Sequence, residues 1–347
     1  EQGARGPATM PMTTPQTNPA THKRNWLLAA LAATAFVLAT LAGCGPHTEA
    51  TATFDKTFIV NGPVRLELTT GSGDAHITTG AADTVAIHGQ IHAGQWLFGN
   101  VQRDLTEAQA NPPVFQQGNL IRVGGVGQHT SGVSVDFTIE VPQNTELHSV
   151  SGSGDVTVAG IQGPANLISG SGNISASQTA GDAQATAGSG NVHFANIQGQ
   201  ATVNTGSGDV EALYINGETR IHTGSGAVQV TQAARSVTVH TGSGNIHVSG
   251  ASGDLHLSAA SGDSTVEGIP GASHFWDLHA NSGEIVLNVP AAGNFRLYAH
   301  SNSGNIDAQI LVVLEGATAS KHEPRARIGD GSARIEAATT SGNITLR

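Results

Sequence analysis

The chain has 347 residues, of which 45 are glycine, 4% are aromatic and 12% are charged. An ordinary globular domain is about 25% charged and about 7% glycine, so this composition favours an elongated array of repeats over a domain with one large core. The formal net charge of −11 argues against nucleic acid as a partner.

The first 43 residues are interpreted as an extension followed by a lipoprotein signal peptide. Residues 1–21 are rich in Pro, Thr, Gln and Ala and have no apolar period, so we expect them to be disordered. A short basic stretch, His22–Arg24, then precedes an apolar run from Trp26 to Ala42. This order is typical of the basic and apolar regions of an export signal.

The only cysteine of the chain, Cys44, ends the apolar run. The letters LAGC at 41–44 resemble the lipobox of bacterial lipoproteins. In that class the signal is cut before the cysteine, and its thiol and new amino group are acylated. Several acyl chains anchor a protein stably, whereas one chain is marginal. The resemblance implies a lipid-anchored protein of the bacterial cell envelope, with residues 44–53 as a linker.

The residue after the cysteine bears on the membrane that holds the protein. Gly45 stands where an Asp retains some lipoproteins in the inner membrane, so we expect the outer membrane or a periplasmic face rather than the cytoplasm. Two alternatives to the lipobox stay open at this point. The segment could be a plain secretory signal, or an uncleaved membrane anchor with a chance cysteine.

Residues 54–150 are predicted to form entry coils and an N-terminal β cap. Runs such as FIVNGPVRLEL, DTVAIHGQI and VSVDFTIEVP resemble strands but keep a looser period than the rest of the chain. Within this region we interpret residues 97–119, which contain two consecutive prolines, as a long surface loop.

From residue 151 onward the chain is built from an 18-residue repeat. The motif SGSGDVTV at Ser151 returns as SGSGNISA, AGSGNVHF, TGSGDVEA, TGSGAVQV and TGSGNIHV. Two later copies follow at a longer, 21-residue interval, and the last copy follows after a longer gap still. A fixed period of this kind is typical of solenoids. The marker glycines of the repeat are Gly154, Gly172, Gly190, Gly208, Gly226, Gly244, Gly262, Gly283, Gly304 and Gly342.

Each repeat holds two short segments in which apolar and polar residues alternate. Val192 and Phe194 flank His193, for example, and Ala201 and Val203 flank Thr202. A period of two indicates strands with one buried face. Stacked repeats put like strand on like strand about 4.8 Å apart. The sequence therefore predicts an all-β fold, a parallel β-solenoid (β-helix) with an 18-residue coil and two strands per coil, over 151–347 with an insertion near 314–330.

The Gly–Ser–Gly element is interpreted as the corner between the two strands of a coil. Glycine reaches positive φ without penalty, and a neighbouring Asp or Asn can hydrogen-bond to nearby backbone. Stacking of coils would then align these Asp and Asn side chains in a polar ladder. Its members would be Asp155, Asn173, Asn191, Asp209, Asn245 and Asp263.

The stretch VSVDFTIEVPQNTELHSVSGSGDVTVAGIQG, followed by repeated SGSGN corners, resembles a bacterial family of β-strand-repeat proteins, DUF4097. The resemblance covers about Phe54–Arg347. It implies a parallel β-helical domain and attachment to the cell surface or envelope. Members are often labelled as adhesins, which is an inference from their shape, and no catalytic residues come with the resemblance.

Enzymatic chemistry is not indicated by the residues. Polysaccharide lyases and hydrolases on β-helices need a general base with a cation, or paired carboxylates in a cleft. Here the acidic residues recur with the repeat, and Arg and Lys are sparse. We therefore expect no enzyme, no catalytic residue and no cofactor.

Two ligand-binding alternatives are also weighed against a structural ladder. Nonapeptide rolls bind Ca²⁺ through an Asp two residues after a glycine, whereas here Asp or Asn follows the glycine directly and Ala227 interrupts the column. A hydrogen-bonded ladder is therefore favoured over calcium. A phosphate loop is rejected because no helix is predicted after the motif.

Histidines stand four residues before several marker glycines, in a column that should face outward. Adjacent coils would put His222 beside His240, and His279 beside His300, about one strand spacing apart. Imidazoles at that spacing can share zinc or copper. Two nitrogens without a nearby carboxylate make a weak site, so chance alignment is favoured and no metal site is assigned.

Together these observations predict a non-catalytic, lipid-anchored envelope solenoid that is adhesin-like. Its repetitive surface would bind envelope polysaccharide or a surface or envelope protein. The main alternative is a structural or sensory accessory of an envelope membrane complex. A polysaccharide-processing β-helix enzyme is the less favoured third hypothesis.

Overall fold

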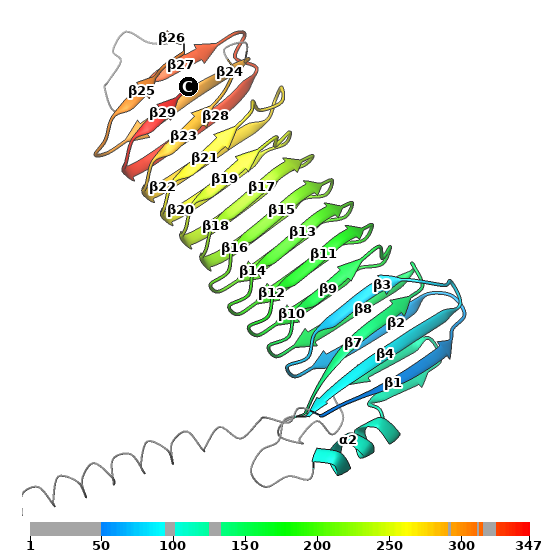
Figure 1. Ribbon diagram of the computed structural model, residues 1–347. Helices are drawn as coiled ribbons and strands as arrows, with labels where there is room; N and C mark the ends of the chain where they lie inside the picture. The colour runs from blue at the N-terminus through cyan, green and yellow to red at the C-terminus, as the bar shows by residue number, and fades with distance from the viewer. Residues whose placement is uncertain (1–49, 94–100, 125–132, 291–292, 311, 315–323) are drawn as a thin grey trace, which may run out of the picture. The chain divides into compact units, whose positions relative to one another are not determined.

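A computed structural model describes residues 50–93, 101–124, 133–290, 293–310, 312–314 and 324–347. These residues are almost entirely β-structure, arranged in two long sheets of 14 and 15 strands that face each other (Figure 1). Among them, no helix is long and apolar enough to cross a membrane. Cys44 and the expected signal peptide lie outside the described residues.

The central coils follow the 18-residue repeat. Strand β12 (Ala183–Ala187) lies parallel to β10 (Ala165–Ser169) in one sheet, and β13 (Val192–Ile197) lies parallel to β11 (Ile174–Thr179) in the other. This confirms the predicted parallel solenoid with two strands per coil. The pairing continues through β14 (Ala201–Thr205), β15 (Val210–Ile215), β16 (Thr219–Ser225), β17 (Val228–Ala233), β18 (Val237–Ser243), β19 (Ile246–Ser249), β20 (Leu255–Ser261) and β21 (Ser264–Glu267).

The core lies between the two sheets and is built by the inward half of each alternating strand. On β13, Val192 and Phe194 are buried, whereas His193 between them is only partly buried. The equivalent inward positions one coil away on each side are the small residues Ala176 and Ala212, also buried. Each buried methylene contributes about 0.8 kcal/mol, so a thin core of this kind depends on many coils.

The N-terminal end is closed by antiparallel pairing and by one helix. Strand β1 (Ala50–Ile59) pairs antiparallel with β4 (Thr84–Ala93), which pairs antiparallel with β7 (Val133–Val141). Helix α2 (Val101–Ala110) packs on β1 and β4. Such pairing covers strand edges that would otherwise invite aggregation. The remaining strands here are β2 (Val64–Thr70), β3 (Ala75–Thr79), β5 (Val114–Gln117), β6 (Leu120–Gly124), β8 (Thr145–Ser151) and β9 (Val156–Ala159).

The predicted surface loop over 97–119 is wrong for most of its described length. Residues 101–110 form α2 and residues 114–117 form β5. The helix is stabilised by Leu105, whose side chain is buried in the core. Strand β1 begins at Ala50, within the range expected as linker.

The C-terminal coils do not stack in the order of the sequence. The last coil, β28–β29, lies between the coil β22–β23 and the coil β24–β25. The outer edge of β24 is occupied by the antiparallel strand β27, so the final parallel strand pairs with its inner edge. The elements are β22 (Phe275–Ser282), β23 (Ile285–Asn288), β24 (Phe295–Ser301), β25 (Ile306–Ala308), β26 (Val313–Leu314), β27 (Arg325–Ile328), β28 (Ala333–Ser341) and β29 (Ile344–Leu346).

Candidate functional site

The marker glycines stand where the backbones of successive coils touch. A Cβ on Gly208 would lie 2.0 Å from the carbonyl oxygen of Gly190, and the same distance separates a Cβ on Gly190 from the oxygen of Gly172. Among the ten marker glycines, only Gly262 has a positive φ. The expected reason for glycine, positive φ, is therefore wrong for most of them. Close approach of backbone to backbone is what requires glycine here.

The left-handed backbone occurs instead at the opposite corner of the coil. Gln178, Asn196, Tyr214 and Gln232 have φ between 53° and 58°. Non-glycine residues rarely adopt this conformation. Sequence analysis missed this corner, although three glycines share its column. These are Gly160, Gly250 and Gly268.

The Asp and Asn side chains beside the marker glycines form a hydrogen-bonded ladder. The backbone N–H of Asn173 donates to Asp155 Oδ1 at 2.7 Å, and that of Asn191 donates to Asn173 Oδ1 at 3.0 Å. The ladder breaks after Ala227, whose side chain has no oxygen. These side chains thus accept backbone hydrogen bonds between coils. The further pairs are Asp209 with Asn191, Ala227 with Asp209, Asp263 with Asn245 and Glu284 with Asp263.

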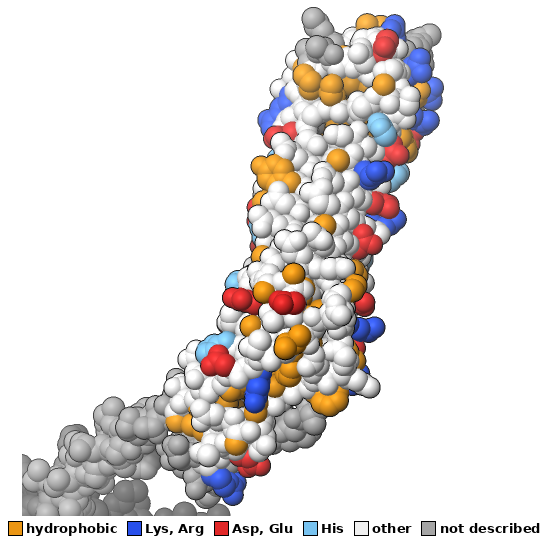
Figure 2. Space-filling view, turned by 90° about the vertical axis from the view of Figure 1, so that its right-hand side faces the viewer, with side chains coloured by type: hydrophobic (Ala, Val, Ile, Leu, Met, Phe, Trp, Pro, Cys, Tyr) orange, Lys and Arg blue, Asp and Glu red, His pale blue; other side chains and the backbone are white. Residues whose placement is uncertain are grey.

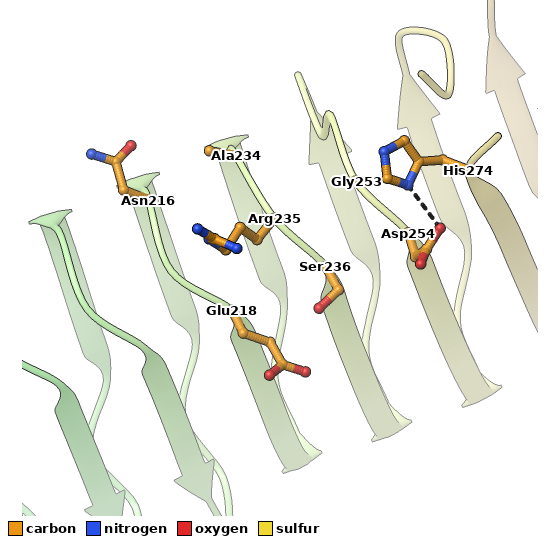
Figure 3. Close-up of a pocket in the computed structure, with 8 residues that line it drawn as sticks. All are labelled: Asn216, Glu218, Ala234, Arg235, Ser236, Gly253, Asp254 and His274. Atoms are coloured by element: carbon orange, nitrogen blue, oxygen red, sulfur yellow. Dashed lines mark hydrogen bonds and ion pairs between the residues drawn. The ribbon is translucent and has the colours of Figure 1, made fainter. Parts of the chain in front are cut away.

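A polar groove lies where the coils lengthen. Leu255 is in register with Val237, one regular period earlier, whereas Trp276 is in register with Leu255 across a longer, 21-residue coil. The longer turn carries His274, whose ring lies beside Asp254 of the coil before it (Figure 3). The groove has a volume of about 620 Å³. It is lined by Asn216, Glu218, Ala234, Arg235, Ser236, Gly253, Asp254 and His274.

Asp254 joins the longer turn to the coil before it. Its Oδ1 accepts the backbone N–H of Phe275 at 2.9 Å and lies 3.0 Å from Nδ1 of His274. The Phe275 hydrogen bond and, after it, the His274 contact lower the pKa of the Asp254 carboxyl. The buried indole of Trp276 also donates to the carbonyl oxygen of Gly253 at 3.1 Å. The groove wall is therefore held in place by several bonds.

The structure brings together one of the two histidine pairs expected from the sequence. His222 and His240 are in register on β16 and β18, with ring centroids 6.5 Å apart and an angle of 57° between the rings. Both side chains are exposed. Within the described residues, no group of three or more His, Cys, Asp or Glu side chains could hold a metal ion.

The second pair expected from the sequence, His279 and His300, is wrong, because the two residues do not lie on neighbouring strands. His279 and His300 are each in register with Ala338, because β28 lies between their strands. His279 Nε2 instead lies 2.8 Å from Asp277 Oδ1, within ion-pair distance. The insertion of the last coil, which the repeat spacing does not reveal, is the cause of the difference.

These features define a parallel β-solenoid with antiparallel strands at both ends. A family model described as Toastrack DUF4097 matches residues 64–347, so the chain belongs to the DUF4097 family. This confirms the resemblance noted in the sequence. No curated protein matches the chain.

Three solved structures are similar to the chain. A proposed cell adhesion protein from Clostridium sporogenes has 11% identity, with 85% of this chain and 99% of that chain covered and a TM-score of 0.20. A proposed adhesin from Bacteroides fragilis has 11% identity, coverage of 85% and 97%, and a TM-score of 0.35. A proposed lipid-binding protein from Parabacteroides distasonis has 10% identity, coverage of 84% and 96%, and a TM-score of 0.29.

Proposed function

We propose that this protein is a lipid-anchored, non-catalytic and adhesin-like component of the bacterial cell envelope. The observation that carries the proposal is the line of polar side chains along the groove. Asn216, Arg235 and Asp254 come from successive coils and line one open groove (Figure 3). A row of donors and acceptors that runs across several coils fits an extended polymer better than a small substrate. The favoured partner is envelope polysaccharide, and a surface or envelope protein is the second.

The carboxylates of the groove support binding rather than catalysis. A glycosidase needs a carboxylic acid with a raised pKa that donates a proton to the leaving group. The pKa of Asp254 is instead lowered by the backbone N–H of Phe275 and by His274. Glu218 forms an ion pair with Arg220 at 2.6 Å, so its carboxylate is already engaged by a neighbouring side chain.

Anchoring is proposed from the sequence motif. Cys44 stands six positions before β1, which begins at Ala50. An acylated Cys44 would therefore hold the first coils close to the membrane. Cells fed an alkyne palmitate should label the protein, and Cys44→Ala should remove the label. Equal labelling of both proteins would contradict the anchor.

The role of the groove in polysaccharide binding can be tested with a substitution of one residue that lines it. Arg235→Ala should weaken capture of extracted envelope polysaccharide by the purified chain, because it removes the groove's guanidinium donor. Arg65→Ala, an exposed arginine on β2 outside the groove, is the matched control and should leave capture unchanged. Equal capture by both variants and the wild type would contradict a role for the groove.

An accessory role in a membrane complex makes a different prediction. Crosslinking in living cells followed by purification of the protein would then recover one membrane protein in fixed ratio. Recovery of polysaccharide instead supports the adhesin-like function.

A further inference from the structure

Arginine side chains from three strands converge on the outer face of the C-terminal coils. Arg296 on β24 is in register with Arg334 on β28 and with Arg327 on β27. Neighbouring strands are about 4.8 Å apart, so these three arginines form a row across the sheet. Arg325 lies two residues before Arg327 on the same strand. Figure 2 shows several Lys and Arg side chains near this end, at the top of the view.

This row is unusual in an acidic protein. The chain has 26 acidic and 15 basic residues, yet four arginines gather on β24, β27 and β28. Glu336 on β28 forms an ion pair with Arg334. Like charges on adjacent strands destabilise a sheet, and an anion bound beside them would reduce that repulsion.

One of these arginines, Arg325, lines a cavity of about 330 Å³. Its floor includes Ala338, which is in register with His279 on one side and with His300 on the other. Because the side chain of Ala338 is only a methyl group between the larger side chains of His279 and His300, the surface is recessed at this position. The polar side chains that line it are His279, Tyr298, His300, Arg325 and Glu336. We call this cavity the arginine pocket. Its volume is at the small end of ligand sites, which span about 300–1,000 Å³.

Tyr298 lines the arginine pocket and contacts two guanidiniums, that of Arg325, which also lines the pocket, and that of Arg334, which does not. The guanidinium carbon of Arg334 lies 4.9 Å from the centre of the Tyr298 ring, and that of Arg325 lies 5.6 Å from it. Arg334 also lies 5.4 Å from the ring centre of Phe275. Cation–π contacts of this kind hold a guanidinium plane in place. A preorganised guanidinium can bind a carboxylate through two parallel hydrogen bonds.

We propose that the arginine pocket binds a carboxylated sugar of an anionic polysaccharide. Its carboxylate would be bound by Arg325 in the pocket and by Arg334, which stacks on Tyr298 of the pocket wall. The two imidazoles and the Glu336 carboxylate would bind ring hydroxyls. This site is separate from the groove of Figure 3, and it does not depend on that groove. A flat membrane surface fits less well, because the pocket is a recess of about 330 Å³, which suits a single sugar residue.

Binding of polygalacturonate to the full chain in detergent tests the proposal, with neutral dextran as the negative control polymer. Arg325→Ala with Arg334→Ala should weaken the binding at least tenfold. Ala338→Met should weaken it comparably, because the longer side chain fills the pocket without changing any charge. Ala338 is on the outer, partly exposed face of β28, so this variant should keep the wild-type melting temperature.

Three results would overturn the proposal. The first is wild-type affinity in Ala338→Met, which would show attraction to surface charge without use of the pocket. The second is equal binding of DNA or of anionic phospholipid vesicles. The third is loss of polygalacturonate binding in Arg235→Ala alone, which would assign the binding to the groove. Loss in Ala338→Met with full binding in Arg235→Ala supports the arginine pocket, whatever the groove binds.

Discussion

The central coils and the C-terminal coils are built from the same repeat but use it differently. From β9 to β21 every strand pairs with its equivalent in the next coil, so each outward position of the repeat becomes a column along the sheet. From β22 onward the spacing lengthens and the last coil inserts out of order. Regular register produces an extended surface whose neighbours follow from the repeat spacing, whereas the departures from register bring together residues that the spacing does not predict as neighbours. Both the end of the polar groove and the arginine pocket lie at such departures.

The largest expected effect on folding comes from deletions within the regular central coils. Removing residues 190–207 takes out one full period, so later strands keep their sheets and a cooperative β-protein should remain with a modestly lower melting temperature. Removing residues 190–198 alone should prevent folding, because each later strand would meet the wrong sheet. Circular dichroism and thermal melts of both deletions check this. Similar melting curves would contradict the 18-residue coil.

The two corners of a central coil should respond oppositely to substitution. Gly208→Ala should lower the free energy of unfolding by at least about 2 kcal/mol, because its Cβ would overlap the carbonyl of Gly190. Gln232→Gly should leave stability unchanged or raise it by up to about 1 kcal/mol, since its φ of 56° suits glycine. Denaturant unfolding of both variants measures the contrast. A small loss in Gly208→Ala would disprove the close contact.

The sequence predicted the central coils well because each coil contacts only its neighbours. Alternation identified the strands, the marker spacing gave the register, and the Asp and Asn column formed the ladder. The reason given for the marker glycines was wrong, since a contact with the preceding coil cannot be seen within one repeat. The left-handed column was missed because Gln178, Asn196, Tyr214 and Gln232 occupy it in consecutive central coils, where glycine is expected.

The C-terminal sites could not be predicted for a different reason. Repeat spacing gives the length of a coil but not its place in the stack. His300 follows His279 by one of the longer intervals, yet β28 separates them. The pairing of Arg334 with Arg296 depends on that same insertion. The sequence between β26 and β28, which includes the short β27, gave no sign of where in the stack the chain would return.

At the boundary of the two regions, Asp254 should stabilise the fold in a pH-dependent way. An unfolded Asp titrates near about 3.9, and the bonds from Phe275 and His274 lower the folded pKa. The contribution is therefore fully present above the unfolded pKa and is lost as the pH falls through the folded pKa. Because the side chain is 47% exposed, Asp254→Asn should cost no more than about 1 kcal/mol at neutral pH.

Thermal melts at neutral pH and at about pH 2.5 check the predicted direction of this pH dependence. The difference between Asp254→Asn and the wild type should shrink at the lower pH. An equal difference at both values would show that the carboxylate charge contributes nothing and that only the shape of the side chain matters.

The smallest expected effect concerns zinc at the regular coils. His222 and His240 are neighbours, but the next residues of their column are Asn204 and Ser258, which supply no third strong ligand. Protein zinc sites use at least three side-chain ligands, so calorimetric titration of the chain with zinc should give no saturable heat that depends on this pair. His222→Ala with His240→Ala is the matched variant. Micromolar binding that disappears in this variant would show that register alone can build a metal site, and that regular coils can be as selective as irregular ones.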